Sequence, residues 1–291
     1  MQHFLTESSN KSKNLQEVYI SDGVKIIKER AFMECIRLKN IRFPNTLETI
    51  ETEAFLNCRS LCNADFPKTL KRIEHNAFDC CHSFIDIVLP ENVAYIGDMV
   101  FHGCGKLNSV ALPKNLQYMG KRVFSECKRL KVVTLSENYP IIPEHTFVNC
   151  YELENTEIPI KVEEIGEWAF YACKKLKTIT LPDNIKKIGE VAFSYCESLI
   201  SVNIPKRVKN ISRETFNECR SLKNVTFTNG LNIIGYSAFN NCKSLEKVVL
   251  PFNLKKIDFY AFSDCENLTE VSISKNIKEI FDYAFHNCKK T

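Results

Sequence analysis

The sequence contains few glycines and no long apolar segment. Only 9 of its 291 residues are glycine, and they form no Gly-rich loop of the kind that cradles phosphate groups. No run of 18 or more apolar residues occurs, which argues against a membrane-spanning helix. The first residues, from Met1 to Glu7, lack the basic and apolar segments of a secretory signal. On these absences alone, we expect a chain that does not span a membrane and that resides in the cytoplasm.

Groups that would suggest catalysis, a cofactor or nucleic-acid binding are also missing. The net charge of +4, from 39 basic and 35 acidic residues, is too small to indicate nucleic acid as a partner. No nucleophile, base and acid recur together in a pattern typical of a triad. A zinc site can be imagined around Cys80 with His75, His82 and His102, but no Cys-x-x-Cys or His-x-x-x-His spacing supports it. We therefore predict no catalytic, cofactor-binding or metal-binding residues, and a protein that is not an enzyme.

A 23-residue repeat accounts for nearly all of the chain. The string Phe-x-x-Cys, usually preceded by alanine, recurs without insertion or deletion. The phenylalanines are Phe32, Phe55, Phe78, Phe101, Phe124, Phe147, Phe170, Phe193, Phe216, Phe239, Phe262 and Phe285. Such a fixed interval over twelve repeats is typical of a solenoid, in which each unit contacts only its neighbours.

Each repeat combines a strand pattern with a short turn. In one copy, Ile179 and Leu181 alternate with Thr178 and Thr180, which is the period-2 pattern of a strand. Pro182 then ends the pairing because proline has no amide hydrogen to donate. The following Ala-Phe-x-x-Cys predicts a short helical turn with one apolar face. One such unit cannot bury its apolar face alone, so we expect successive copies to stack in register.

The cysteines follow the repeat rather than a disulfide pattern. Twelve of the 14 lie three residues after the repeated phenylalanine, and only Cys62 and Cys80 lie elsewhere. Parallel side chains in register do not provide the torsion that a disulfide needs. We therefore predict a ladder of buried free thiols, which removes the argument for secretion that a high cysteine count would otherwise make.

The repeat resembles the BspA-like, or Treponema pallidum-type, leucine-rich repeat over essentially the whole chain. The resemblance implies an α/β repeat solenoid: a right-handed superhelix of twelve 23-residue repeats, with a parallel β-sheet on the concave side and short helical turns opposite. We assign residues 14–291 to the solenoid. Residues 1–13 form a degenerate half-repeat cap, in which Met1, Phe4, Ser9 and Ser12 fall in register with the first full repeat. Family members are surface or secreted adhesion proteins that bind host or partner proteins.

Two sets of residues in the variable columns are candidates for partner binding. The first is aromatic and comprises Trp168, Tyr236, Phe259, Tyr260, Phe281 and Tyr283. These rings form either a protein-docking patch or a cover over their own backbone and the solenoid end. The second is basic and comprises Lys186, Lys187, Lys206, Arg207, Lys209, Lys255, Lys256, Lys275 and Lys278. These side chains either attract an acidic protein, a glycan or a membrane surface, or form an ordinary solvated edge.

Two functional hypotheses follow. In the first, the protein is a surface adhesion molecule of the BspA-like kind, located on the cell surface or secreted, as the resemblance implies. In the second, it is an intracellular scaffold, which the free thiols and the missing signal favour. Both hypotheses expect a protein partner, either host or self, and a chain that is a monomer or part of a larger assembly.

Overall fold

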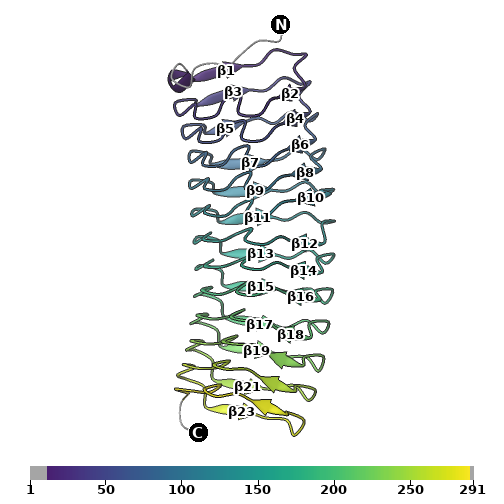
Figure 1. Ribbon diagram of the computed structural model, residues 1–291, viewed down its shortest axis with the longest axis vertical. Helices are drawn as coiled ribbons and strands as arrows, with labels where there is room; N and C mark the ends of the chain where they lie inside the picture. The colour runs from purple at the N-terminus through teal and green to yellow at the C-terminus, as the bar shows by residue number, and fades with distance from the viewer. Residues whose placement is uncertain (1–11, 289–291) are drawn as a thin grey trace. The chain divides into compact units, whose positions relative to one another are not determined.

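The computed structural model describes residues 12–288, and the chain divides after Tyr139 into two compact units. The cap predicted over residues 1–13 falls almost entirely outside the described residues, as do Met1, Phe4 and Ser9. Both units are built from short parallel strands in two rows, the odd-numbered strands in one row and the even-numbered strands in the other (Figure 1). Each unit is therefore a parallel β-solenoid of the leucine-rich-repeat type.

The first unit begins with a short 3-10 helix, η1 (Ser12–Asn14). Its odd-numbered strands are β1 (Glu17–Tyr19), β3 (Asn40–Arg42), β5 (Asn63–Ala64), β7 (Asp86–Val88), β9 (Ser109–Ala111) and β11 (Val132–Thr134). Its even-numbered strands are β2 (Ile26–Ile27), β4 (Thr49–Ile50), β6 (Arg72–Ile73), β8 (Tyr95–Ile96) and β10 (Tyr118–Met119). All pairings are parallel and join positions one repeat apart, as in Val133 opposite Val110.

The second unit repeats this arrangement. Its odd-numbered strands are β13 (Asn155–Glu157), β15 (Thr178–Thr180), β17 (Ser201–Asn203), β19 (Asn224–Thr226), β21 (Lys247–Val249) and β23 (Glu270–Ser272). Its even-numbered strands are β12 (Ile141–Ile142), β14 (Glu164–Ile165), β16 (Lys187–Ile188), β18 (Asn210–Ile211), β20 (Ile233–Ile234), β22 (Lys256–Ile257) and β24 (Glu279–Ile280). The strands again pair in parallel at an interval of one repeat, so side chains in one column lie next to each other on successive turns.

The odd-numbered strands alternate between water and the core, as the sequence predicts. In β15, Thr178 and Thr180 are exposed while Ile179 between them is buried. Pro182 follows the strand and starts a turn, in which its carbonyl accepts the amide hydrogen of Ile185 at 3.1 Å. In strands such as β7, β15 and β21, the alternation places the middle residue in the core and leaves its two neighbours on the surface, where a partner can reach them.

The repeated phenylalanines form the core of each unit. Phe193 is fully buried, and its ring stacks on Phe170 at 5.2 Å and on Phe216 at 5.4 Å between ring centroids. Ladders of leucine, isoleucine and cysteine surround these rings and are also buried. Each turn thus covers the apolar surface that its neighbours cannot bury alone, as predicted.

The segment Ala-Phe-x-x-Cys forms turns rather than the short helix that the sequence predicts; within residues 12–288, η1 is the only helical element. Trp168 and Ala172, which flank Phe170, have left-handed backbones with φ of 58° and 56°. The amides of these three residues donate to carbonyls on the following turn, as Phe170 does to Ala192 at 2.8 Å. A helix cannot form because its amides must donate four residues back along the same segment.

The ladder cysteines are free and almost all buried, as predicted. The thiol of Cys196 donates to the carbonyl oxygen of Phe170 on the preceding turn at 3.2 Å. That carbonyl also accepts the amide hydrogen of Cys173 at 3.2 Å, so both of its lone pairs are used. Burial raises the pKa of the Cys173 thiol well above its usual value, which keeps it protonated and able to donate. Cysteine therefore serves here as a small core side chain that also carries a hydrogen-bond donor.

Candidate protein-binding surface

Five of the six aromatic candidates lie together on the last turns of the second unit. Tyr260 stacks on Tyr283 at 5.3 Å and meets Tyr236 edge-on at 5.9 Å. Phe259 and Phe281 contact each other at 4.7 Å. Tyr236, Phe259 and Tyr283 are exposed, while the other two are half-buried. We call these five residues the aromatic strip.

Trp168, the sixth aromatic candidate, has other ring partners. It occupies the same column as Tyr260 but lies four repeats earlier, and it stacks on His145 at 5.9 Å. Its second ring contact is with Tyr171 on its own turn at 4.7 Å. Trp168 is half-buried, which fits a ring that packs over its own backbone rather than one that extends the aromatic strip.

The first part of the basic candidate set is neutralised by acidic side chains on the preceding turn. Lys186 pairs with Glu163 at 2.7 Å, and Lys187 pairs with Glu164 at 2.7 Å. The hydrogen bond from Lys186 and its charge lower the pKa of Glu163. Lys206 pairs in the same way with Asp183 at 2.9 Å. These pairs are exposed and contribute little to stability, but they reduce the positive charge of this region.

Five of the six remaining basic candidates are not neutralised in this way. Arg207, Lys209, Lys255, Lys275 and Lys278 are exposed and form no ion pair with any residue between 12 and 288. They occupy the turns that follow the odd-numbered strands of the second unit. We call these five residues the basic turn surface.

Lys256 connects the two surfaces. Its ammonium group lies 4.6 Å from the centre of the Phe281 ring and 3.0 Å from the Asp258 carboxylate. Phe281 in turn contacts Phe259. Lys256, which follows Lys255 of the basic turn surface in the chain, therefore packs against the aromatic strip. The sequence suggested two separate candidate patches, and the structure brings their C-terminal parts together.

Phe252 belongs to this surface and was missed by the sequence analysis. Its side chain is 56% exposed, and its carbonyl oxygen accepts hydrogen bonds from Ser274 and Asn276 on the next turn at 3.1 Å each. The signal was present in the sequence, because Phe252 stands in a column that holds Lys206 before it and Lys275 after it. A phenylalanine in a column of mostly polar side chains marks a ring that has no place in the core.

A second group was missed in the first unit. The guanidinium of Arg72 lies 3.9 Å from the centre of the Tyr95 ring, which stacks on Tyr118 at 4.7 Å. The Tyr95 hydroxyl lies 3.4 Å from His75. Arg72, Tyr95 and Tyr118 stand in one column on successive repeats, so a column-by-column comparison of the sequence would have found them.

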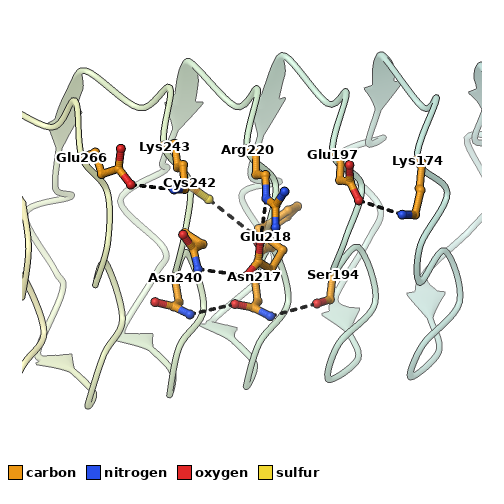
Figure 2. Close-up of polar contacts among 12 residues, drawn as sticks. Lys174, Ser194, Glu197, Asn217, Glu218, Arg220, Asn240, Cys242, Lys243 and Glu266 are labelled. Carbon is orange, nitrogen blue, oxygen red and sulfur yellow. Dashed lines mark hydrogen bonds and ion pairs between the residues drawn. The ribbon is translucent and has the colours of Figure 1, made fainter.

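The turns that carry Phe-x-x-Cys bear a polar network in the second unit (Figure 2). The side-chain amide of Asn217 donates to Ser194 at 3.3 Å and accepts from Asn240 at 3.0 Å. On the same turns, Arg220 donates to the carboxylate of Glu218 at 2.8 Å. Each of these groups has a partner on its own or an adjacent turn. We therefore interpret the network as one that holds successive turns together.

Sequence comparison identifies the repeat. Residues 5–131, 71–200 and 186–291 match the profile described as "BspA type Leucine rich repeat region (6 copies)". The chain belongs to the BspA-type leucine-rich-repeat family. Comparison with curated proteins gives no match.

Solved structures of bacterial leucine-rich-repeat proteins are similar to this chain. A leucine-rich repeat protein from Bacteroides ovatus is 29% identical with a TM-score of 0.77, over 95% of this chain and 77% of the other. A leucine-rich cell surface protein from Faecalibacterium prausnitzii is 26% identical with a TM-score of 0.61, over 96% and 89%. The T. pallidum leucine-rich-repeat protein is 30% identical with a TM-score of 0.52, over 55% of this chain and 78% of the other.

Solenoids of the BspA-type leucine-rich-repeat family are typically not enzymes. Between residues 12 and 288, no three His, Cys, Asp or Glu side chains come together in a way that could hold a metal ion. Cys80 is half-buried, and burial together with the charge of Asp79 raises its pKa to about 11, so its thiol is not activated as a nucleophile. Over the same residues, no helix is long and apolar enough to cross a bilayer.

Proposed function

We propose that this BspA-type protein is a non-enzymatic binding module whose partner is another protein, either from a host or from the same cell. The aromatic strip is the observation that carries the proposal. Tyr236, Phe259 and Tyr283 are exposed on three successive repeats, and tyrosine is among the residues that dominate binding energy at protein interfaces. Within this proposal, the solenoid is a right-handed superhelix of twelve turns with the odd-numbered strands on its concave side, and the chain is a monomer or part of a larger assembly.

Substitution within the aromatic strip tests the binding role. Immobilised wild-type protein, a Phe259→Ser/Tyr283→Ser variant and a Tyr19→Ser control should be incubated with the same host-cell and native-cell extracts. Tyr19 is 73% exposed, and its hydroxyl donates to Glu17 at 3.3 Å, which makes it a matched exposed tyrosine outside the aromatic strip. We expect one or more proteins to be retained by the wild type and the control but lost from the double variant. Equal retention by all three would contradict the assignment of the strip, and no retained protein would contradict the binding role.

A role as a surface adhesion protein is the form of this function that the comparisons favour. The solved relative from F. prausnitzii is described as a cell surface protein, and it aligns with 96% of this chain. The alternative is an intracellular scaffold, which the buried free thiols favour because they suit a reducing compartment. Antibody labelling of intact, unpermeabilised cells separates the two. Detection only after lysis would support the scaffold and contradict the adhesion role.

A further inference from the structure

The basic turn surface keeps its charge because the register of the solenoid denies it partners. Where lysines pair with an acid on a neighbouring turn, the acid stands one repeat earlier in the same column, as Glu163 does for Lys186, or one repeat later, as Glu266 does for Lys243. Lys255 instead follows Asn232 and precedes Lys278 in its column. The amide of Lys278 donates to the carbonyl of Lys255 at 2.9 Å, so the two backbones are in contact. Two unpaired ammonium groups therefore stand on neighbouring turns, which are spaced about 4.8 Å apart in a parallel sheet.

The other members of the basic turn surface are unpaired for the same reason. Lys275 follows Phe252 in its column, and Lys209 lies between Lys186 and Asn232. The preceding turn offers no carboxylate at either position. Unpaired like charges on one surface raise the local positive potential and attract an anionic partner.

Apolar side chains are interleaved with these charges. Phe252 is 56% exposed in the same column as Lys275, and Phe259 is 37% exposed next to Phe281, over which Lys256 lies. A purely anionic polymer would pair with the cations but would leave both exposed rings in contact with water. A purely apolar partner would cover the rings but would desolvate the ammonium groups without pairing them, which is costly. A partner that carries both carboxylates and apolar side chains satisfies both demands.

We infer that the surface around Phe252, Lys255, Phe259 and Lys278 binds an acidic protein segment in which carboxylates alternate with aromatic or aliphatic side chains. This inference rests on the proposed function and specifies the chemistry of the partner. Both kinds of side chain can come from one short segment, because the cations and rings occupy the same and adjacent turns. An anionic polysaccharide is the competing ligand that the charges alone would admit.

A displayed library of random peptides tests the inference without knowledge of the natural partner. The full chain should be immobilised at low ionic strength, and peptides should be selected for binding and then sequenced. We expect enrichment of peptides that contain both acidic and apolar residues, with binding that weakens as salt screens the charges. Heparin should be measured in parallel as an anionic polymer without apolar side chains. Selected peptides without acidic residues, or tight heparin binding with no selected peptide, would overturn the inference.

Charge reversal then locates the bound peptide. Lys255→Glu/Lys278→Glu should weaken binding of the selected peptides about tenfold or more at low salt and less at high salt. Phe252→Ser should weaken it as well, with little change in salt dependence. Lys177→Glu/Lys223→Glu is the control, because both lysines are exposed and unpaired in the same unit but lie on the turns that precede the strands. Equal losses in the control and the test variant would overturn the location.

The natural partner separates this inference from the proposed function. A protein that is retained by wild type should be lost both from Phe259→Ser/Tyr283→Ser and from Lys255→Glu/Lys278→Glu. If only the aromatic variant loses it, the aromatic strip binds protein but the acidic-segment inference is wrong. If neither variant loses it, the location of the proposed function is wrong as well. Circular dichroism of each variant confirms that these exposed substitutions leave the fold intact.

Discussion

Replacing Phe193 with alanine removes one ring from the middle of a continuous stack. The ring is fully buried and stacks on Phe170 and Phe216 with interplanar angles of 6° and 3°. Truncation of a buried phenylalanine costs about 3–5 kcal/mol through lost transfer free energy and the cavity left behind. A stacked aromatic pair contributes about 0.5–1.5 kcal/mol beyond the area that it buries. Because two such pairs are lost, we expect Phe193→Ala to fall in the upper part of the truncation range and to lower the free energy of unfolding by about 4–5 kcal/mol.

Phe285 provides a matched control within the same column. Its ring is half-buried and stacks on Phe262 at 5.4 Å, with no second phenylalanine among the described residues. The same truncation there leaves a smaller cavity and breaks one stack, so the cost should be about half as large. Urea unfolding followed by circular dichroism measures both variants. Comparison of their midpoints is valid provided that the slope of the transition is unchanged.

Two results would refute the reasoning. A loss below about 1 kcal/mol for Phe193→Ala would mean that the ring does not fill the interior. Equal losses for Phe193→Ala and Phe285→Ala would mean that stacking on both sides adds nothing. Either result would remove the basis for treating the phenylalanine ladder as the continuous core.

Three further predictions concern thiols and backbone packing. The free energy of unfolding should fall steeply above about pH 8.5, where the unfolded chain begins to lose thiol protons, because burial raises the pKa of ladder thiols such as Cys173 in the folded state. Urea titrations from pH 7 to 10 measure this slope, and a flat profile contradicts it. Alkylation of Cys80 in the native protein should be slow at pH 8 and accelerate towards pH 11, since burial and the Asp79 charge raise its pKa to about 11; a rate independent of pH argues against that value. Gly189→Ala should lower the free energy of unfolding by about 1–3 kcal/mol, because a Cβ there would lie 2.5 Å from the Glu167 backbone nitrogen. Gly105→Ala is the control: a Cβ there would meet nothing closer than 3.9 Å, so the same urea assay should show no change.

The core could be predicted from the sequence because every repeat places the same kinds of apolar residue at the same positions. The constant repeat length places Phe170, Phe193 and Phe216 in one column, and stacking follows once the turns are in register. The ion pairs follow from the same rule, since Glu163 stands one repeat before Lys186. A column-by-column comparison of charges would have shown that Lys186, Lys187 and Lys206 are each neutralised by an acid on the preceding turn.

The turn conformation could not be predicted from local pattern. Ala-Phe-x-x-Cys has the spacing of a short helix, but the amide of Phe170 donates to Ala192 on the next turn at 2.8 Å. Hydrogen bonds between turns compete with those within the segment, and a sequence window around Phe170 contains no information about that competition. The left-handed backbones at Trp168 and Ala172 follow from the same contacts, because tryptophan and alanine have no intrinsic preference for that conformation.

A solenoid of identical turns makes binding residues recognisable as departures from their own column. Interior columns are almost uniform because each position must fill the same space, so variation there is costly. Outer columns are free to vary, and many of their charges are matched to a neighbour on the adjacent repeat, as Lys187 is to Glu164. Phe252 and the Lys255–Lys278 pair depart from this matching on adjacent turns. Phe252 exposes a ring in a column of mostly polar side chains, and Lys255 and Lys278 place like charges next to each other. Neither feature stabilises the chain by itself, and the acidic segment that we infer as the partner would cover the ring and neutralise the lysines together.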